Sequence, residues 1–131
     1  MCGLGQGSKA APASWIQLSL MIVQAYKRQG LALVVADPIT GEKIESVGCM
    51  FVNDTNLYCM HPVLLSVALV VLQAQACMSL WSELLSATGG AIKGPKSFWY
   101  LVDYKCVHGK WEYGSFDDNK FTLYLPEVPN Q

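Results

Sequence analysis

Four short segments carry residue types that could bind a ligand or take part in a reaction. The first is Gly3-Leu4-Gly5-Gln6-Gly7-Ser8, where small residues leave backbone N–H groups accessible just before a predicted helix, a position that favours anions. The second is Phe51-Val52-Asn53-Asp54, where a carboxylate on a tight turn could hold a divalent cation. The third is a pair of Cys-x-His sequences, and the fourth is the lysine-bearing loop at 89–97.

Each segment also has an explanation that requires no ligand. A glycine-rich start is often a flexible leader, and Asn-Asp is favourable turn chemistry in its own right. The sequences Cys59-Met60-His61 and Cys106-Val107-His108 could each offer two ligands to zinc, but zinc ligands are usually separated by more than one residue. The favoured interpretation of these pairs is therefore two buried thiols and two histidines at strand ends. For the loop at 89–97, the favoured interpretation is two solvent-exposed lysines.

The helices that would position these residues follow from the spacing of apolar side chains. Spacings of three and four from Ala11 to Ala25 predict a helix, which Gly30 would end. A second helix is predicted from Pro62 up to Thr88-Gly89-Gly90. Its expected apolar stripe consists of leucines and one alanine: Leu65, Leu69, Leu72, Ala76, Leu80 and Leu84.

Runs rich in valine, leucine and aromatic residues predict strands around these helices. Between the helices we expect strands at 31–36, 44–52 and 55–60, with a turn at 37–41 and Asn53-Asp54 as a hairpin connection. After the second helix we expect strands at 98–103, 110–113 and 121–125, with a turn at His108-Gly109. This order predicts an α+β fold in which two helices pack on one face of an antiparallel sheet.

Composition limits the class of protein. With 131 residues, 52% hydrophobic and 15% charged, the chain should form one folded domain and not a disordered tail. Nine Lys and Arg against ten Asp and Glu leave a net charge of -1. Whole-chain electrostatics would therefore not supply the affinity that a stand-alone nucleic-acid binder needs.

The cysteines and the absence of targeting patterns indicate a location. Five cysteines are an odd count, and the first residues contain no apolar signal segment, so we expect reduced thiols and an intracellular protein, cytoplasmic or nuclear. The most membrane-like stretch, at 63–72, is well short of the roughly 20 residues that span a bilayer. We therefore expect no membrane association.

Taken in order, the segments resemble the palm of a retrotransposon reverse transcriptase. Gln6-Gly7-Ser8-Lys9-Ala10-Ala11-Pro12 is similar to the second palm motif, Gln-Gly-x-x-x-Ser-Pro, and Phe51-Val52-Asn53-Asp54 to the metal-binding motif Phe/Tyr-x-Asp-Asp. The loop at 88–97 looks like the next motif, with its lysine at Lys96, and residues 98–111 are similar to the segment after that motif in some retroelement polymerases. The resemblance covers residues 3–113. It implies a partial palm domain over 1–125, without fingers or first palm motif, and a C-terminal tail at 126–131.

The resemblance implies RNA-directed DNA polymerase chemistry. Enzymes of this family add deoxynucleotides to a DNA primer on an RNA template, using two Mg²⁺ ions. By resemblance, Asp54, Asn53 and Lys96 are the catalytic positions, and the first two are the metal ligands. Gln6-Gly7-Ser8 would line the nucleotide and the template. The resemblance also predicts that these groups share one cavity.

Two departures from the family predict that the chain is inactive by itself. Only five residues precede Gln6 and none is acidic, so the carboxylate of the first palm motif is missing. At the hairpin, Asn53 and Asn56 stand where the family has aspartates, and an amide oxygen is a neutral, weaker ligand for a hard cation. One carboxylate, Asp54, cannot hold two closely spaced Mg²⁺ ions with four positive charges.

Two other classes of protein stay open. A small α+β domain of this apolar content could be a non-catalytic interaction module that forms homo-oligomers or binds a protein partner, because a palm without its fingers exposes apolar faces. A membrane-associated protein organised around residues 62–81 is the third possibility. For the polymerase, the expected partners are an RNA template, a DNA primer and the missing part of the enzyme.

Overall fold

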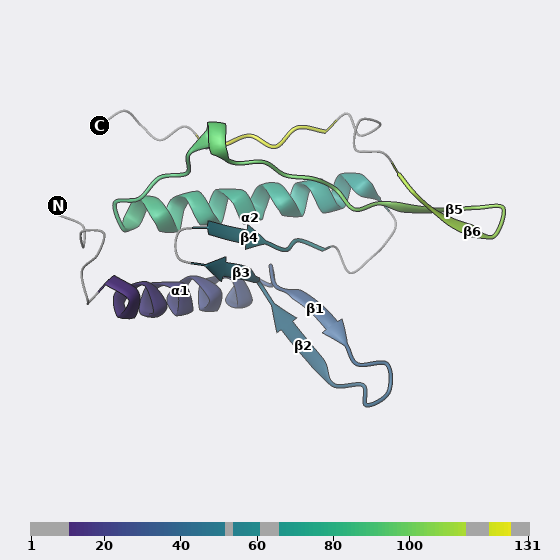
Figure 1. Ribbon diagram of the computed structural model, residues 1–131, viewed down its shortest axis with the longest axis horizontal. Helices are drawn as coiled ribbons and strands as arrows, with labels where there is room; N and C mark the ends of the chain where they lie inside the picture. The colour runs from purple at the N-terminus through teal and green to yellow at the C-terminus, as the bar shows by residue number, and fades with distance from the viewer. Residues whose placement is uncertain (1–10, 52–53, 61–65, 115–120, 127–131) are drawn as a thin grey trace.

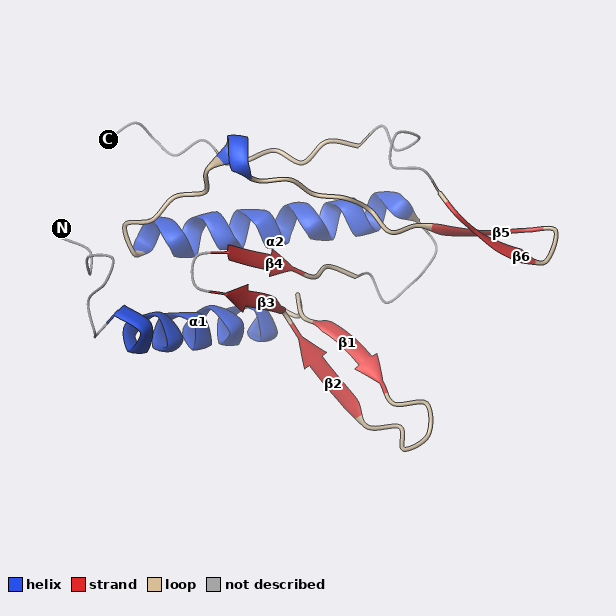
Figure 2. Cartoon of the chain, viewed as in Figure 1, coloured by secondary structure: helices blue, strands red, loops and turns tan. Residues whose placement is uncertain are grey.

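The computed structural model describes residues 11–51, 54–60, 66–114 and 121–126. Helices and antiparallel strand pairs both occur in this part of the chain, so the expected α+β class is confirmed (Figures 1 and 2). The elements follow in the order α1 (Ala11–Arg28), β1 (Leu33–Ala36), β2 (Lys43–Ser46), β3 (Gly48–Phe51), β4 (Asp54–Leu57), α2 (Val67–Ala87), the 3-10 turn η1 (Gly94–Lys96), β5 (Tyr104–Val107) and β6 (Lys110–Tyr113).

Helix α1 forms and ends as its sequence predicts. Ile22 and Tyr26 are buried on one face, with Leu18 packed beside them. The helix closes at Gly30, which has a φ of 68°, and the Leu31 N–H donates to the Tyr26 carbonyl at 3.0 Å. A left-handed glycine and a bond of this span are typical of helix C-termini.

The strands form separate pairs and not the single sheet expected from the sequence. In the described residues, β1 pairs with β2, β3 with β4 and β5 with β6, each pair antiparallel. Hairpin β1–β2 extends away from the helices, and hairpin β5–β6 extends along the long axis beyond α2 (Figure 1). Only β3–β4 lies beside both helices, so it is the hairpin that builds the core with them.

The expected strand at 44–52 is wrong as one element, because it divides at Val47. Residues before Val47 pair with β1 and residues after it pair with β4. The Val47 side chain is buried, and its carbonyl accepts a hydrogen bond from the Tyr58 N–H at 2.9 Å. At Gly48 a Cβ would lie 2.0 Å from the Asn56 carbonyl oxygen, so glycine permits the close approach of β3 to β4.

Helix α2 ends where predicted, but its buried face differs from the predicted stripe. Its end is followed by Gly89, with a φ of 81°, while the expected start at 62–65 lies outside the described residues. Leu72 of the predicted stripe is 66% exposed, whereas Trp81 and Cys77 are buried. Apolar residues surround much of this helix, so periodicity alone does not select the face that packs. By length and composition α2 also meets the criteria for a membrane-crossing helix, as core helices often do.

Two of the three strands expected after α2 are wrong in position. Residues 98–103 are not a strand, and the pairing begins at Tyr104, beyond that range. Residues 121–126 pair with no strand; there the Gln75 side chain donates to the Tyr124 carbonyl and accepts from the Tyr124 N–H, both at 2.8 Å. The predicted turn is confirmed, because His108 and Gly109 have φ values of 49° and 77°, as a two-residue hairpin turn requires.

Candidate functional site

The acidic residue of the candidate site, Asp54, is the first residue of β4 and is exposed. It pairs with Phe51, so the connection between the strands consists of residues 52–53, one position earlier than the expected break. Asn53 therefore lies in the connection, outside the described residues. Asp54 and Asn56 alternate with the half-buried Thr55 and Leu57, and alternation places both polar side chains on the solvent face of the hairpin.

Helix α1 begins and α2 ends at the same end of the long axis, whereas hairpin β3–β4 lies beside both helices farther along that axis (Figure 1). Asp54 is the first residue of β4 in that hairpin. The segment Gln6-Gly7-Ser8, which precedes α1, lies outside the described residues.

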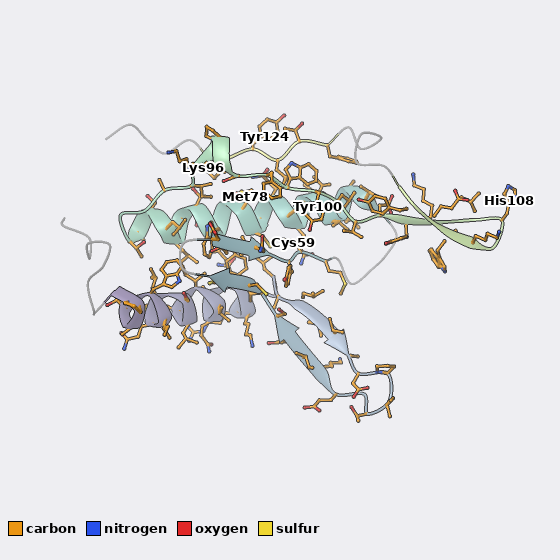
Figure 3. The ribbon with its side chains drawn as sticks, in the orientation of Figure 1. Cys59, Met78, Lys96, Tyr100, His108 and Tyr124 are labelled. Carbon is orange, nitrogen blue, oxygen red and sulfur yellow. The ribbon has the colours of Figure 1, made fainter. Side chains whose placement is uncertain are left out.

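Lys96 lies on the opposite side of α2 from hairpin β3–β4 (Figure 3). It belongs to η1, where its N–H donates to the Lys93 carbonyl at 2.9 Å, and its side chain is exposed. Among the described residues, no ion pair joins Lys96 to Asp54. The structure therefore does not bring these two predicted catalytic residues into contact.

A shallow cavity of about 330 Å³ lies on α1, lined by Leu20, Met21, Gln24, Ala25 and Arg28. Neither Asp54 nor Lys96 contributes to its lining. The cavity that the resemblance leads us to expect would include Gln6-Gly7-Ser8, which lie outside the described residues, so it stays a prediction.

Metal ligands are sparse in the part of the chain that the structure describes. No group of three or more His, Cys, Asp and Glu side chains is arranged there to hold an ion. His61 lies outside the described residues, whereas Cys59 packs against the core and His108 stands at the tip of β5–β6, far along the molecule (Figure 3). The described residues of the two Cys-x-His sequences are thus widely separated and form no joint zinc site.

Sequence reasoning missed the polar contacts inside the core. The Tyr26 phenol donates a hydrogen bond to the Cys77 carbonyl, and burial raises the pKa of Tyr26, with Cys77 and Cys59 as further causes. On the surface, the Tyr58 phenol donates to the Cys49 sulfur at 3.2 Å. Tyr26 stands four residues after Ile22 and could have been assigned to the core from that spacing, but no local pattern links it to Cys77.

Comparison with known proteins identifies no relative of this chain. No protein-family model, curated protein or solved structure matches this chain. Support for a function therefore comes from the motifs and from the geometry described above.

Proposed function

We propose that this chain is a segment of a reverse-transcriptase palm that catalyses no nucleotide transfer by itself. The observation that carries the proposal is the order of the motifs, with Asp54 at the start of β4 in a hairpin that lies beside both helices (Figure 1). A Gln-Gly sequence before α1, a Phe-x-Asn-Asp sequence across the β3–β4 connection and Lys96 after α2 follow one another as in the palm motifs that the chain resembles.

The donor set explains why the segment would be inactive. Asp54 is exposed and its neighbour on the same face, Asn56, offers only a neutral amide oxygen. Two Mg²⁺ ions in a polymerase are clamped by several carboxylates, and these residues do not fit that requirement. No catalytic step is therefore assigned to this chain, and the RNA template, the DNA primer and Mg²⁺ belong to the intact enzyme. An intracellular location is part of the same proposal.

A primer-extension assay tests the inactivity. The full chain is incubated with a DNA primer annealed to an RNA template, the four deoxynucleotides, and Mg²⁺ or Mn²⁺. The expected result is no extension, both for the wild type and for Asn53→Asp, because two adjacent carboxylates on an exposed hairpin do not replace the several carboxylates that clamp two Mg²⁺ ions. Extension that is lost in Asp54→Ala would overturn the inactivity and strengthen the polymerase assignment.

A non-catalytic interaction module is the second candidate, favoured by large apolar side chains that the described elements leave exposed. They come from several elements: Ile16, Leu20 and Met21 on α1, Val35 and Ile44 in β1–β2, and Trp111 in β5–β6. Contiguous exposed apolar surface of this kind is typical of sites that bind another protein.

Sedimentation velocity distinguishes a self-associating module from a palm segment whose apolar faces would be covered by another part of the polymerase. A module that covers its own apolar faces sediments as a dimer, and dissociates on dilution. A monomer at every concentration would exclude the homo-oligomer.

A further inference from the structure

Strand β2 has one edge that no described strand covers. In the described part of the chain it pairs with β1 alone, in a hairpin that extends away from the helices (Figure 1). Its first three residues, Lys43, Ile44 and Glu45, are exposed. An open strand edge carries unpaired backbone N–H and C=O groups, and a lone two-stranded hairpin is only marginally stable in water. Both properties favour the addition of a further strand at this edge.

The hydrogen bonding of the hairpin determines which residues of β2 direct their backbone groups to the open edge. The Asp37 N–H donates to the Glu42 carbonyl at 2.8 Å, in the same register as the paired strands. In an antiparallel pair only every second residue exchanges hydrogen bonds with the partner strand. Ile44 therefore directs its backbone groups toward β1, whereas Lys43 and Glu45 direct theirs to the open edge.

The charges of Lys43 and Glu45 make this edge complementary to itself. When two copies of β2 meet antiparallel at their open edges, each of these residues must pair with itself or with the other one across the two-fold axis. A register centred on Lys43 or on Glu45 places like charges opposite each other, which is destabilising. A register centred on Ile44 places each Lys43 opposite the Glu45 of the other copy and so forms two opposite-charge pairs.

The same register continues an apolar row across both hairpins. Val35 pairs with Ile44 within the hairpin, so both side chains lie on one face, where they are 52% and 63% exposed. Centring on Ile44 places the two Ile44 side chains opposite each other, between the two Val35 side chains. The charged residues lie on the other face, where Glu45 also forms an ion pair with Lys27 at 3.5 Å. The result is a four-stranded sheet with an apolar face, which is more stable than an isolated hairpin.

We propose that the open edge of β2 is a homodimerisation site, at which two copies of this chain form one antiparallel sheet in the order β1–β2–β2–β1, centred on Ile44. Because the two central strands run in opposite directions and each hairpin extends away from its own helices, the helices of the two copies lie at opposite ends of this sheet. The inference names the surface and the partner of the interaction module and rests on that candidate function. It does not depend on the polymerase proposal.

Exchange of the two charges tests the register. Sedimentation velocity of the full chain should show a dimer, and Lys43→Glu should raise its dissociation constant at least about tenfold, because two opposite-charge pairs become two like-charge pairs. The double variant Lys43→Glu/Glu45→Lys restores opposite charges across the axis and should recover most of this loss. Lys93→Glu makes the same change of charge at an exposed position after α2 and should leave the dissociation constant unchanged. A double variant that associates no better than Lys43→Glu would overturn the proposal.

Disulfide trapping tests the edge itself. In the proposed dimer the two copies of residue 44 form a non-hydrogen-bonded pair with Cα atoms about 4.5 Å apart, so Ile44→Cys should link the two chains under air oxidation. Val35→Cys is the matched control on the same face, because its two copies would be three strand spacings apart, about 14 Å, and should not link. Cleavage after Glu42 and Glu45 releases residue 44 in a tripeptide that contains no native cysteine, so mass spectrometry identifies the linked product.

The outcomes separate this proposal from the candidate function on which it rests. A wild type that is monomeric at every concentration would exclude the homo-oligomer, and the β2 site with it. A dimer that Val35→Cys traps better than Ile44→Cys, or that Lys43→Glu leaves unchanged, would retain the self-associating module but overturn the β2 site.

Discussion

The phenol of Tyr26 donates a hydrogen bond to the backbone carbonyl of Cys77, and this contact joins α1 to α2 inside the core. Tyr26 is 1% exposed and Cys77 is 1% exposed, so water cannot replace either partner. A buried polar pair of this kind contributes to stability mainly because breaking it leaves an unsatisfied group.

Tyr26→Phe should therefore destabilise the fold by about 1–2 kcal/mol, through loss of the hydrogen bond without loss of ring packing. Urea unfolding followed by tryptophan fluorescence measures the change, because Trp81 lies in the same cluster. Tyr124→Phe, at an exposed position, is the control and should change stability by less than about 0.5 kcal/mol. Equal effects of the two variants would show that the Tyr26 hydroxyl is not structurally important.

Alkaline pH should weaken the fold. Burial raises the pKa of Tyr26 above its ordinary value of 10.0, and contact with Cys59 and burial raise that of Cys77 above 9.0. A raised pKa in the folded state means that the unfolded chain loses its protons first, so this stability is fully present below about pH 9 and declines as pH rises.

The change in the free energy of unfolding with pH is the quantity to measure. One proton contributes up to about 1.4 kcal/mol per pH unit to the free energy of unfolding above pH 10. The free energy of unfolding, measured at pH values between 8 and 11, should therefore fall more steeply with pH in the wild type than in Tyr26→Phe. A wild type whose stability is constant over this range would contradict the buried, neutral phenol.

Gly48→Ala should be one of the most damaging single changes. The added Cβ would lie 2.0 Å from the Asn56 carbonyl oxygen, a backbone atom in the paired strand, so the β3–β4 pairing must open. We expect a loss of about 3 kcal/mol or more in the free energy of unfolding.

Gly90→Ala is the matched control for this change. Its added Cβ would meet nothing closer than 3.4 Å, and the expected effect is within about 0.5 kcal/mol. Chemical denaturation of both variants makes the comparison. A Gly48→Ala protein as stable as Gly90→Ala would mean that β3 and β4 do not pair in the register Cys49–Asn56 and Met50–Thr55.

Local sequence features predict much of the fold. Gly30 ends α1 with a positive φ, and the turn after β1 is fixed by Asp37, whose carboxylate accepts from the Ile39 N–H and the Thr40 hydroxyl, each at 2.8 Å. These hydrogen bonds also lower the pKa of Asp37. Such features depend on residues a few positions apart, so the sequence alone contains the necessary information.

The sequence-based predictions of strands are wrong where pairing with residues distant in the sequence determines the structure. The strand at 44–52 divides because β1 and β4 each take one half of it. The segment at 98–103 has the composition of a strand, but no strand pairs with it in the described residues. For the candidate site, the exposed face of Asp54 and Asn56 follows from alternation, whereas the position of Lys96 across α2 depends on tertiary packing.

Manganese binding at the β3–β4 hairpin tests the palm assignment most directly. If this hairpin descends from a cation site, the double variant Asn53→Asp/Asn56→Asp restores carboxylates beside Asp54. It should then bind Mn²⁺ at least about tenfold more tightly than the wild type, as measured by water-proton relaxation. Asp54→Ala in that background should remove the gain. Gln17→Glu/Gln24→Glu, which adds the same charge on exposed positions of α1, should not produce it. Equal Mn²⁺ affinity in the hairpin and α1 variants would contradict the account.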